Sequence, residues 1–248
     1  MKLRRILIVV GIVAAVLLIA TILIFTGAWI PNQPSQADYP VRGIDVSHHQ
    51  GEIEWDKVAA AGIRFAYIKA TEGADYDDPN FKRNWDGAAA AHIARGAYHF
   101  FTLGSPGRKQ AEHFLSQIFP YSQALPPAVD IELTGGNHAI SSPEQFQREL
   151  SDFIATVEAR LGTEPVIYSS RDFRKRYLQG GVMKSWWISD VIFAPKQEPG
   201  EEWKFWQYSW RGKIPGITGF ADLDVFAGSA RELEGLTLPL ADRGLGAQ

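Results

Sequence analysis

The feature that most constrains this chain is an alternation of short apolar runs with amphipathic segments that begins at Val41. Strands are predicted at 41–46, 65–70, 94–102, 128–132 and 166–169, and helices at 55–61, 79–93, 106–119, 142–161 and 171–178. Such alternation favours a mostly parallel sheet with crossover helices. Later strands at 186–188, 204–208 and 223–226 are separated by loops. The sequence therefore predicts an α/β fold, an irregular TIM-like (β/α) barrel that loses its helices in its last third.

The composition excludes several classes of function. The chain has 248 residues, which is enough for one large α/β domain or two small ones. Its net charge of −3 gives no basic excess that would indicate a nucleic-acid partner. The absence of cysteine excludes disulfides, thiolate metal sites and a cysteine nucleophile. The 8 Trp, 8 Tyr and 14 Phe belong mostly to a core, but aromatic rings also stack against sugars.

The N-terminus reads as a membrane segment. Lys2, Arg4 and Arg5 precede an uncharged apolar run at 6–25, and about 20 apolar residues are needed to cross a bilayer as a helix. The basic flank places the N-terminus in the cytoplasm and Trp29 at the outer interface. A cleaved signal peptide is the alternative, which would make the protein secreted, but no clear A-x-A cleavage site follows the run.

These features divide the chain into four parts. We expect a basic flank and single-pass anchor at 1–30, a polar linker at 31–40, a barrel at 41–230 outside the cytoplasm, and a loose tail at 231–248. A monomer is expected.

Two carboxylates stand at the centre of the barrel region, in the run Ala-Val-Asp-Ile-Glu at 128–132. In a strand, Asp130 and Glu132 point to the same face, with Cα atoms about 6.5 Å apart. Two adjacent acids in a core strand cost free energy unless they have a use. Active sites of parallel barrels lie at such strand ends. The structural alternative is a pair of edge carboxylates in solvent or in salt bridges.

Polar side chains also gather at the ends of the other predicted strands. They are Asp45, Lys69, Glu72, Tyr98, His99, Tyr168, Gln207, Tyr208 and Asp222. In a parallel barrel these ends converge on one face and form a cleft rich in carboxylates, with Lys69 as the obvious counter-cation. Crowded carboxylates raise one another's pKa, so one of them stays protonated near neutral pH and can act as a general acid at a glycosidic oxygen.

Six short motifs, taken together, resemble glycoside hydrolase family 25, the muramidases or Chalaropsis-type lysozymes. In order they are Asp45-Val-Ser-x-x-Gln50, Tyr67-Ile-Lys-Ala-Thr-Glu-Gly73, Gly96-Ala-Tyr-His-Phe100, Asp130-Ile-Glu132, Ile167-Tyr168 and Trp206-Gln-Tyr208. The resemblance covers residues 41–228. It implies an irregular β/α barrel that cleaves the β-1,4 bond after N-acetylmuramic acid in peptidoglycan, without a cofactor.

The resemblance also assigns roles to the acids. Glu132 matches the proton donor, Asp130 its partner acid and Asp45 the acid of the first strand. Asp222 matches the acid near the last strand, but the surrounding Ala-Asp-Leu-Asp departs from the usual Val-Asp and leaves Asp224 as an alternative. The family is thought to retain configuration, with the substrate's 2-acetamido group attacking the anomeric carbon. An i,i+2 strand pair alone fits either stereochemical outcome.

The resemblance further indicates which residues bind sugar. Positions that match the walls of the subsites are Tyr67, Tyr98, Tyr168, Trp187 and Gln207. Around Trp187 the sequence Ile-Ser-Asp-Val departs from the usual Ile-Ala-x-Tyr, which puts one wall of the cleft in doubt. Glu72 is a further candidate, or it only pairs with Lys69.

Three other interpretations compete with this one. His48, His49 and His99 could hold a metal ion with the acids, but they lack an H-x-x-x-H or similar spacing, so no metal is expected. A catalytically silent peptidoglycan-binding tether would keep the aromatic residues of the cleft and could dispense with the acids, all of which are present here. A hydrolase of a related polymer such as chitin also fits the sequence.

Overall fold

The structure is a computed structural model that describes residues 2–133, 142–178, 185–196 and 202–239. A nine-stranded sheet forms its centre, with the strands in the order β1-β9-β8-β7-β6-β5-β4-β2-β3. An additional pairing of β1 with β2 closes the sheet into a barrel and leaves β3 outside it, so eight of the nine strands form the barrel. The strands are β1 (Arg42–Val46), β2 (Ile63–Glu72), β3 (Tyr76–Asp77), β4 (Ala94–Phe100), β5 (Ala128–Asp130), β6 (Val166–Ser170), β7 (Trp186–Ser189), β8 (Trp203–Gly212) and β9 (Ala221–Phe226).

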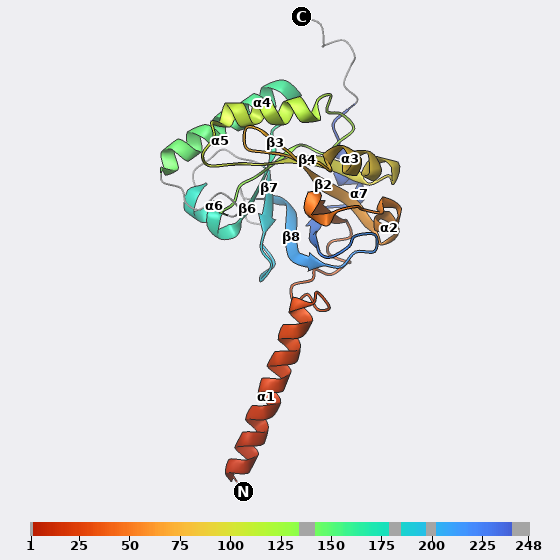
Figure 1. The fold of residues 1–248 in the computed structure, drawn as a ribbon, viewed down its shortest axis with the longest axis vertical. Helices are drawn as coiled ribbons and strands as arrows, with labels where there is room; N and C mark the ends of the chain where they lie inside the picture. The colour runs from red at the N-terminus through yellow and green to blue at the C-terminus, as the bar shows by residue number, and fades with distance from the viewer. Residues whose placement is uncertain (1, 134–141, 179–184, 197–201, 240–248) are drawn as a thin grey trace, which may run out of the picture.

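The barrel is mostly parallel, as the sequence predicted, with one antiparallel strand that the sequence did not predict. Strands from β1 through β2, β4, β5, β6 and β7 to β8 pair in parallel, whereas β9 is antiparallel to both β8 and β1. The outer helices are α2 (Trp55–Ala60), α3 (Phe81–Ala90), α4 (Gly107–Ile118), α5 (Pro143–Leu161) and α6 (Arg171–Tyr177), and α4 and α5 lie together on one side of the barrel (Figure 1). Within the described residues, no helix lies between β7 and β9. The fold class is therefore confirmed.

Two apolar layers hold the barrel together, one inside it and one between strands and helices. The inner layer includes Phe65, Tyr67, Trp187, Phe205 and Phe226, all buried. Their rings leave no room on the neighbouring strands, because a Cβ at Gly43 would collide with the ring of Phe65 and one at Gly96 with the ring of Tyr67. The outer layer includes Val58, Ala88, Phe114 and Phe153.

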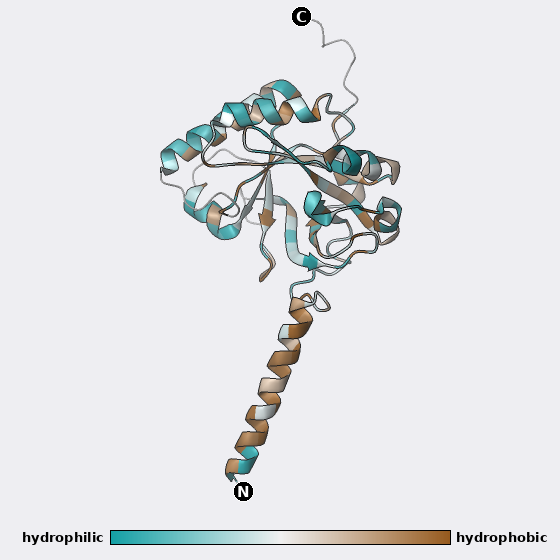
Figure 2. Cartoon of the chain, viewed as in Figure 1, coloured by the Kyte–Doolittle hydropathy of each residue, from teal (hydrophilic) through white to brown (hydrophobic). Residues whose placement is uncertain are grey.

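The N-terminal helix α1 (Lys2–Phe25) projects from the barrel as a separate arm (Figure 1). It has 24 residues, a mean hydropathy of 3.3 in its most apolar window and no buried residue. Hydrophobic residues occupy almost its whole length beyond the first turn (Figure 2). By length and composition this helix can cross a membrane.

The structure corrects the prediction of a loose tail from residue 231. Helix α7 (Ala230–Gly235) begins with a capping box, in which Ser229 accepts from the Glu232 amide and Glu232 accepts from the Ser229 amide. Leu233 of this helix is buried in the inner apolar layer. Further on, Leu238 exchanges backbone hydrogen bonds with residues 123 and 124. The chain is therefore packed against the barrel at least to residue 238.

Candidate active site

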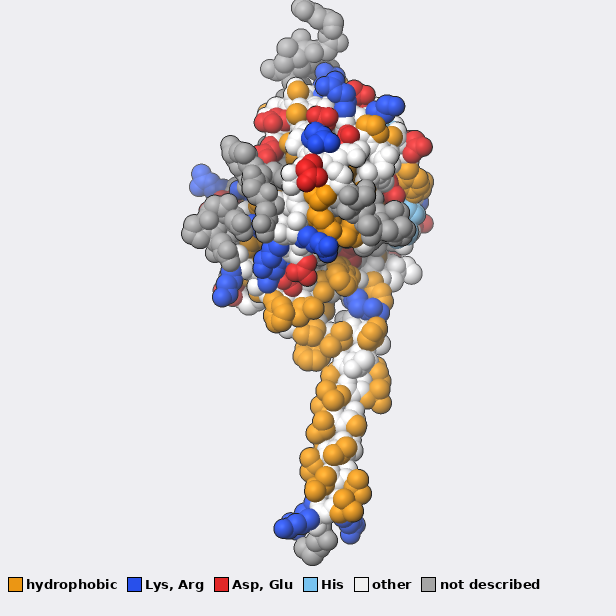
Figure 3. All heavy atoms as spheres, turned by 90° about the vertical axis from the view of Figure 1, so that its left-hand side faces the viewer, with side chains coloured by type: hydrophobic (Ala, Val, Ile, Leu, Met, Phe, Trp, Pro, Cys, Tyr) orange, Lys and Arg blue, Asp and Glu red, His pale blue; other side chains and the backbone are white. Residues whose placement is uncertain are grey.

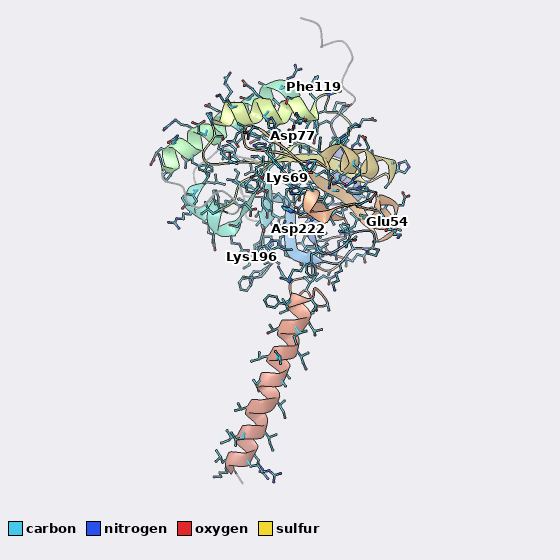
Figure 4. All side chains as sticks on the ribbon, in the orientation of Figure 1. Glu54, Lys69, Asp77, Phe119, Lys196 and Asp222 are labelled. Atoms are coloured by element: carbon cyan, nitrogen blue, oxygen red, sulfur yellow. The ribbon has the colours of Figure 1, made fainter. Side chains whose placement is uncertain are left out.

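A cavity of about 320 Å³ opens at the carboxyl ends of the parallel strands. It is lined by Asp45, Val46, Ser47, His49, Gln50, Lys69, Glu72, Tyr98, Phe100, Asp130, Glu132, Tyr168, Trp187, Gln207 and Asp222. Every residue to which the family resemblance gave a catalytic or sugar-binding role is in this set except Tyr67. Of the polar residues predicted at the strand ends, His99 and Tyr208 do not line the cavity and are buried instead. Lys69 and Asp222 come from opposite parts of the chain and lie near the middle of the globular part (Figure 4).

Strand alternation places the acids in the cavity. On β5, Val129 and Ile131 pack into the outer apolar layer, so Asp130 and Glu132 point the other way, toward the cavity. Regular pairing of β5 ends at Asp130, two residues earlier than the sequence predicted. The extended path continues, because the Ile131 amide donates to the Tyr168 carbonyl over 2.9 Å. Both carboxyl groups therefore reach the same space.

The acids raise one another's pKa in this buried setting. Burial, then the charges of Glu132 and Asp45, raise the pKa of Asp130 well above its ordinary value, against the opposing effect of Lys69. One oxygen of Asp130, Oδ1, is buried and has no hydrogen-bond partner among the described residues, which also favours the protonated form. Burial, then the charge of Asp45, likewise raises the pKa of Asp222. The cavity is thus suited to hold at least one proton on a carboxyl group.

Lys69 is the one lysine or arginine that lines the cavity in the described part of the chain. Its ammonium group lies 2.6 Å from Glu72 Oε2 and 4.9 Å from the centre of the Phe100 ring. Glu72 therefore pairs with Lys69 and also lines the cavity, and its role in sugar binding stays a prediction. The pair leaves Lys69 partly neutralised, so it offsets little of the negative charge of the four acids.

Gln207 connects three walls of the cavity. Its amide nitrogen donates to Asp45 Oδ2 over 2.9 Å. Its oxygen accepts from the hydroxyls of Tyr168 and Ser189, at 2.9 and 2.8 Å, and from the indole of Trp210 at 2.8 Å. These bonds fix the orientation of the amide, and they attach β8 to β1, β6 and β7 at the level of the acids.

A few polar groups lie below the floor of the cavity, within the inner apolar layer of the barrel. Tyr67 is fully buried there, and its hydroxyl donates to the Pro126 carbonyl over 3.1 Å. The prediction that Tyr67 lines the cleft is therefore wrong, because the ring lies under Trp187, with centroids 4.7 Å apart, instead of facing the cavity.

Asp224 lies below the floor of the cavity too, whereas Asp222 lines the cavity. The Trp187 indole donates to Asp224 Oδ1 over 2.8 Å. Asp224 Oδ2 accepts no hydrogen bond from an N–H or hydroxyl group of the described residues, and its polar neighbour is the carboxyl of Asp45. Burial, then the charge of Asp224, raises the pKa of Asp45, and burial raises the pKa of Asp224. The geometry thus favours Asp222 as the fourth acid of the cavity, with Asp224 as a buried neighbour of Asp45.

The histidines do not form a metal site with these acids. His99 is fully buried outside the cavity, between Thr71 Oγ1 at 2.7 Å and Gln110 Oε1 at 3.1 Å. Burial lowers the pKa of His99 to about 3, so its ring is neutral. His48 contacts Asp78 at 2.9 Å. Among the described residues, no group of three or more His, Cys, Asp or Glu is arranged to hold a metal ion.

The geometry agrees with a comparison against known families. The family model described as glycosyl hydrolases family 25 matches residues 44–217. This chain belongs to glycosyl hydrolase family 25.

Relatives in this family share both sequence and fold with the chain. Lysozyme M1 of Streptomyces globisporus is 40% identical over 205 residues, which cover 78% of this chain and 70% of that protein. The structure of a family 25 glycosyl hydrolase from Bacillus anthracis matches with a TM-score of 0.76 and 33% identity, over 82% of this chain and 96% of that one. The bacterial lysozyme of Streptomyces coelicolor matches with a TM-score of 0.72 and 38% identity, over 79% and 96%.

The family 25 cavity also contains residues to which sequence reasoning gave no role. Ser47, His49 and Gln50 line it beside Asp45. Gln50 accepts from the Ser47 amide over 2.8 Å and donates to the Phe220 carbonyl over 3.2 Å, so it ties the end of β1 to the β8–β9 hairpin. The motif Asp45-Val-Ser-x-x-Gln50 contained the signal for this contact, because Ser and Gln at that spacing form a capping box.

Proposed function

We propose that this chain is a lysozyme-type glycoside hydrolase that cleaves the β-1,4 bond between N-acetylmuramic acid and N-acetylglucosamine in peptidoglycan. The observation that carries the proposal is the family 25 cavity with Asp130 and Glu132 together at its centre. Relatives named lysozyme and N,O-diacetylmuramidase support the same activity. A silent binding module is less favoured, because a cavity without catalysis has no need to bury Asp45 and Asp130 at a cost in free energy.

Glu132 is the proposed general acid. Of the adjacent pair, Asp130 is buried whereas Glu132 is half-buried, so Glu132 presents the more accessible carboxyl to a leaving oxygen. Its proton passes to the glycosidic oxygen as the bond from that oxygen to the anomeric carbon breaks. Glu132, now a carboxylate, then takes a proton from the water that completes the hydrolysis.

Asp130 is proposed to act on the substrate's 2-acetamido group. A carboxyl oxygen of Asp130 would accept the acetamido N–H, and the acetamido oxygen would attack the anomeric carbon from the face opposite the leaving group. Water then opens the resulting ring and regenerates the acetamido group. Two inversions at the same carbon give net retention of configuration. Asp45 and Asp222 would add negative charge near the developing oxocarbenium ion.

The sugar rings are proposed to rest against the aromatic side of the cavity. Tyr98, Tyr168 and Trp187 line it, and Gln207 and Glu72 are its proposed polar contacts to the sugar. Aromatic rings bury large apolar areas and keep a polar group at their edge, which suits a sugar with one apolar face.

The location of the protein follows from α1. An apolar N-terminal helix fits a membrane anchor or a signal sequence, and a cell-wall enzyme fits a site outside the cytoplasm. We propose the anchor, with the N-terminus inside, the linker at 31–40 and a monomeric catalytic barrel from residue 41 to about residue 230 outside. Cleavage of α1 would instead release the barrel.

The test is hydrolysis of purified peptidoglycan by the full chain in detergent. Replacement of the general acid, Glu132→Gln, is expected to lower the rate roughly 10²–10⁴-fold, because the proton donor is lost. Mass spectrometry should find N-acetylmuramic acid at the new reducing ends. Glu158→Gln, on the exposed face of α5, is the matched control and should leave the rate unchanged.

Two other results would contradict the proposal. If the parent chain binds peptidoglycan but releases no fragments, it is a tether rather than an enzyme. If it hydrolyses a polymer of N-acetylglucosamine faster than peptidoglycan, the substrate is chitin-like.

A further inference from the structure

Large apolar side chains are exposed at the end of the barrel that meets α1. They are Trp29, Ile192, Phe193 and Trp210, with exposed fractions of 48%, 70%, 66% and 56%, and together they are called the juxtamembrane patch. Figure 3 shows hydrophobic side chains gathered at the base of the globular part, continuous with the apolar surface of the helix. Exposed apolar side chains that form a continuous surface usually mark an interaction site.

Direct contacts place the patch beside the end of α1. Arg211, next to Trp210, donates from Nε to the Phe25 carbonyl over 2.9 Å and stacks its guanidinium 5.0 Å from the Phe25 ring. The turn after the helix is equally close to the barrel, because a Cβ at Gly27 would collide with the Arg211 carbonyl. Just after the end of β7, Asn32 donates to the Asp190 carbonyl over 3.1 Å. Both sides of the patch are thus attached to the segment that leaves the helix.

The loop that carries Ile192 and Phe193 is held in a defined shape. Asp190 Oδ1 accepts from the amides of both residues, at 3.1 and 2.8 Å. The other oxygen of Asp190 pairs with Arg171 at 2.8 Å, and the Asp190 carbonyl accepts from the Trp206 indole at 2.8 Å. The bonds of Asp190 therefore fix the conformation of the turn, and the side chains of Ile192 and Phe193 on it are exposed.

The length of α1 sets the level of the patch relative to a bilayer. At about 1.5 Å per residue, the uncharged run 6–25 is about 30 Å long, which equals the hydrocarbon thickness. Phe25 would then lie at the outer boundary of the hydrocarbon, and the patch beside it would lie among the headgroups. Trp side chains favour that level. Arg211, Lys213 and the exposed Lys196 supply cations there, and Lys196 lies on the side of the barrel toward α1 (Figure 4).

We propose that the juxtamembrane patch is a second membrane-binding surface, which inserts Ile192 and Phe193 shallowly into the outer leaflet and holds the barrel against the bilayer. A lipid surface fits better than a sugar, because Ile192 has no group that hydrogen-bonds to a hydroxyl and because the patch continues the apolar surface of α1. The proposal requires that α1 spans the membrane.

The patch also borders the active-site cavity. Trp210 and Ser189, at the two sides of the patch, both donate to Gln207, which lines the cavity. Contact with lipid would therefore hold the rim of the cavity near the bilayer and favour glycan strands close to the membrane. This consequence, unlike the lipid contact itself, depends on the proposed function.

The experiment uses the full chain in nanodiscs of phosphatidylcholine and phosphatidylglycerol. Because the chain has no cysteine, a single Lys196→Cys can carry a fluorophore next to an intact patch. We expect lipids with a spin label near the headgroup to quench this fluorophore. A label at Glu158→Cys on α5 should stay unquenched, and a label at Thr26→Cys reports on α1.

The decisive variant adds Ile192→Asp and Phe193→Asp to the labelled chain. Quenching at 196 should then fall to the level of the Glu158→Cys label, while quenching at 26 remains. Ser151→Asp with Ala155→Asp, on the exposed face of α5, adds the same charge and should change neither signal.

The outcomes separate the patch from the anchor. Quenching at 26 but not at 196 in the parent chain would overturn the proposal and leave the anchor intact. If neither the label at 26 nor the label at 196 is quenched in the parent chain, both the membrane-spanning assignment of α1 and the lipid contact of the patch are wrong. If the aspartate variant keeps its quenching but loses peptidoglycan binding, the patch is a glycan surface and the proposal is wrong.

Discussion

At the scale of residues, the cavity is defined by carboxyl groups whose ionisation is linked. Asp45, Asp130 and Asp222 have raised pKa values mainly because they are buried, and each is raised further by the charge of a neighbouring acid. Lys69 is the nearby cation, and it is already paired with Glu72. A proton placed on this cluster is therefore shared among several sites, and the apparent pKa values belong to the cluster.

The buried pair of Asp45 and Asp224 should make stability depend on pH. Each has a folded-state pKa above its unfolded value of about 3.9, so between the two values the folded chain holds a proton that the unfolded chain has released. The contribution of these two groups to the free energy of unfolding is fully present below about pH 4. It is lost as the pH rises toward the folded-state pKa, by at most about 1.4 kcal/mol per pH unit for each group.

Replacement of Asp224 by Asn tests this linkage. The amide keeps an oxygen for the Trp187 indole and gives the Asp45 carboxyl a neutral neighbour, so the variant should lose less stability than the parent between pH 4 and neutrality. Urea unfolding at several pH values measures the difference. Asp86→Asn, at an exposed pair with Lys82, is the control and should keep the parental slope. Equal slopes for all three proteins would exclude a shared proton at Asp45 and Asp224.

Alternation along strands predicted the direction of a side chain but not its depth. It placed Asp130 and Glu132 on one face, and the structure confirms that both reach the cavity. The same rule puts Asp222 and Asp224 on one face, as it puts Tyr67 on the face of Lys69. The register between strands, such as Asp45 opposite Asp222, decides which of these side chains lines the cavity and which lies below it. The register is fixed by contacts between residues distant in sequence.

At the scale of elements, the early strands and helices were predictable because apolar runs alternate regularly with amphipathic segments from Val41 onward. Helix α5 is an example, since it was predicted at 142–161 and runs from Pro143 to Leu161, with Ser142 accepting from the Gln145 amide as the N-cap. Helix α7 has six residues, as many as α2, but it was missed because the chain from residue 231 shows little pattern. The signal that could have found it is the capping box Ser229-Ala-Arg-Glu232.

Helix α7 should contribute strongly to stability because it covers one end of the inner apolar layer. Leu233 is buried there, with Leu236 packed against the same cluster. Leu233→Ala removes buried methyl groups and leaves a cavity, so we expect a loss of about 2–4 kcal/mol in the free energy of unfolding. Chemical denaturation of the full chain in detergent measures the loss. Glu234→Ala, at an exposed position on the same helix, should change stability much less. Equal small effects would mean that the barrel is closed without α7.

At the scale of the whole molecule, α1 and the barrel meet at the end where the cavity lies. The β8–β9 hairpin makes this link, because Arg211 bonds the end of α1 and Gln50 bonds Phe220 beside the cavity. The sequence predicted both parts, a membrane helix and a barrel, but it could not predict how they join. Their arrangement depends on a few contacts between residues near position 26 and residues near position 211, which no local pattern reveals.

The orientation of α1 in the membrane gives the last prediction. Basic residues before the apolar run and few after it favour an N-terminus in the cytoplasm, so the linker and barrel should face outward. In intact cells, a maleimide that cannot cross the membrane should label Ala37→Cys in the linker and should label Leu3→Cys only after the cells are opened. The parent chain has no cysteine and should stay unlabelled under both conditions. Labelling of Leu3→Cys from outside would reverse the topology. Release of a labelled Ala37→Cys product that lacks residue 3 would instead show that α1 is cleaved.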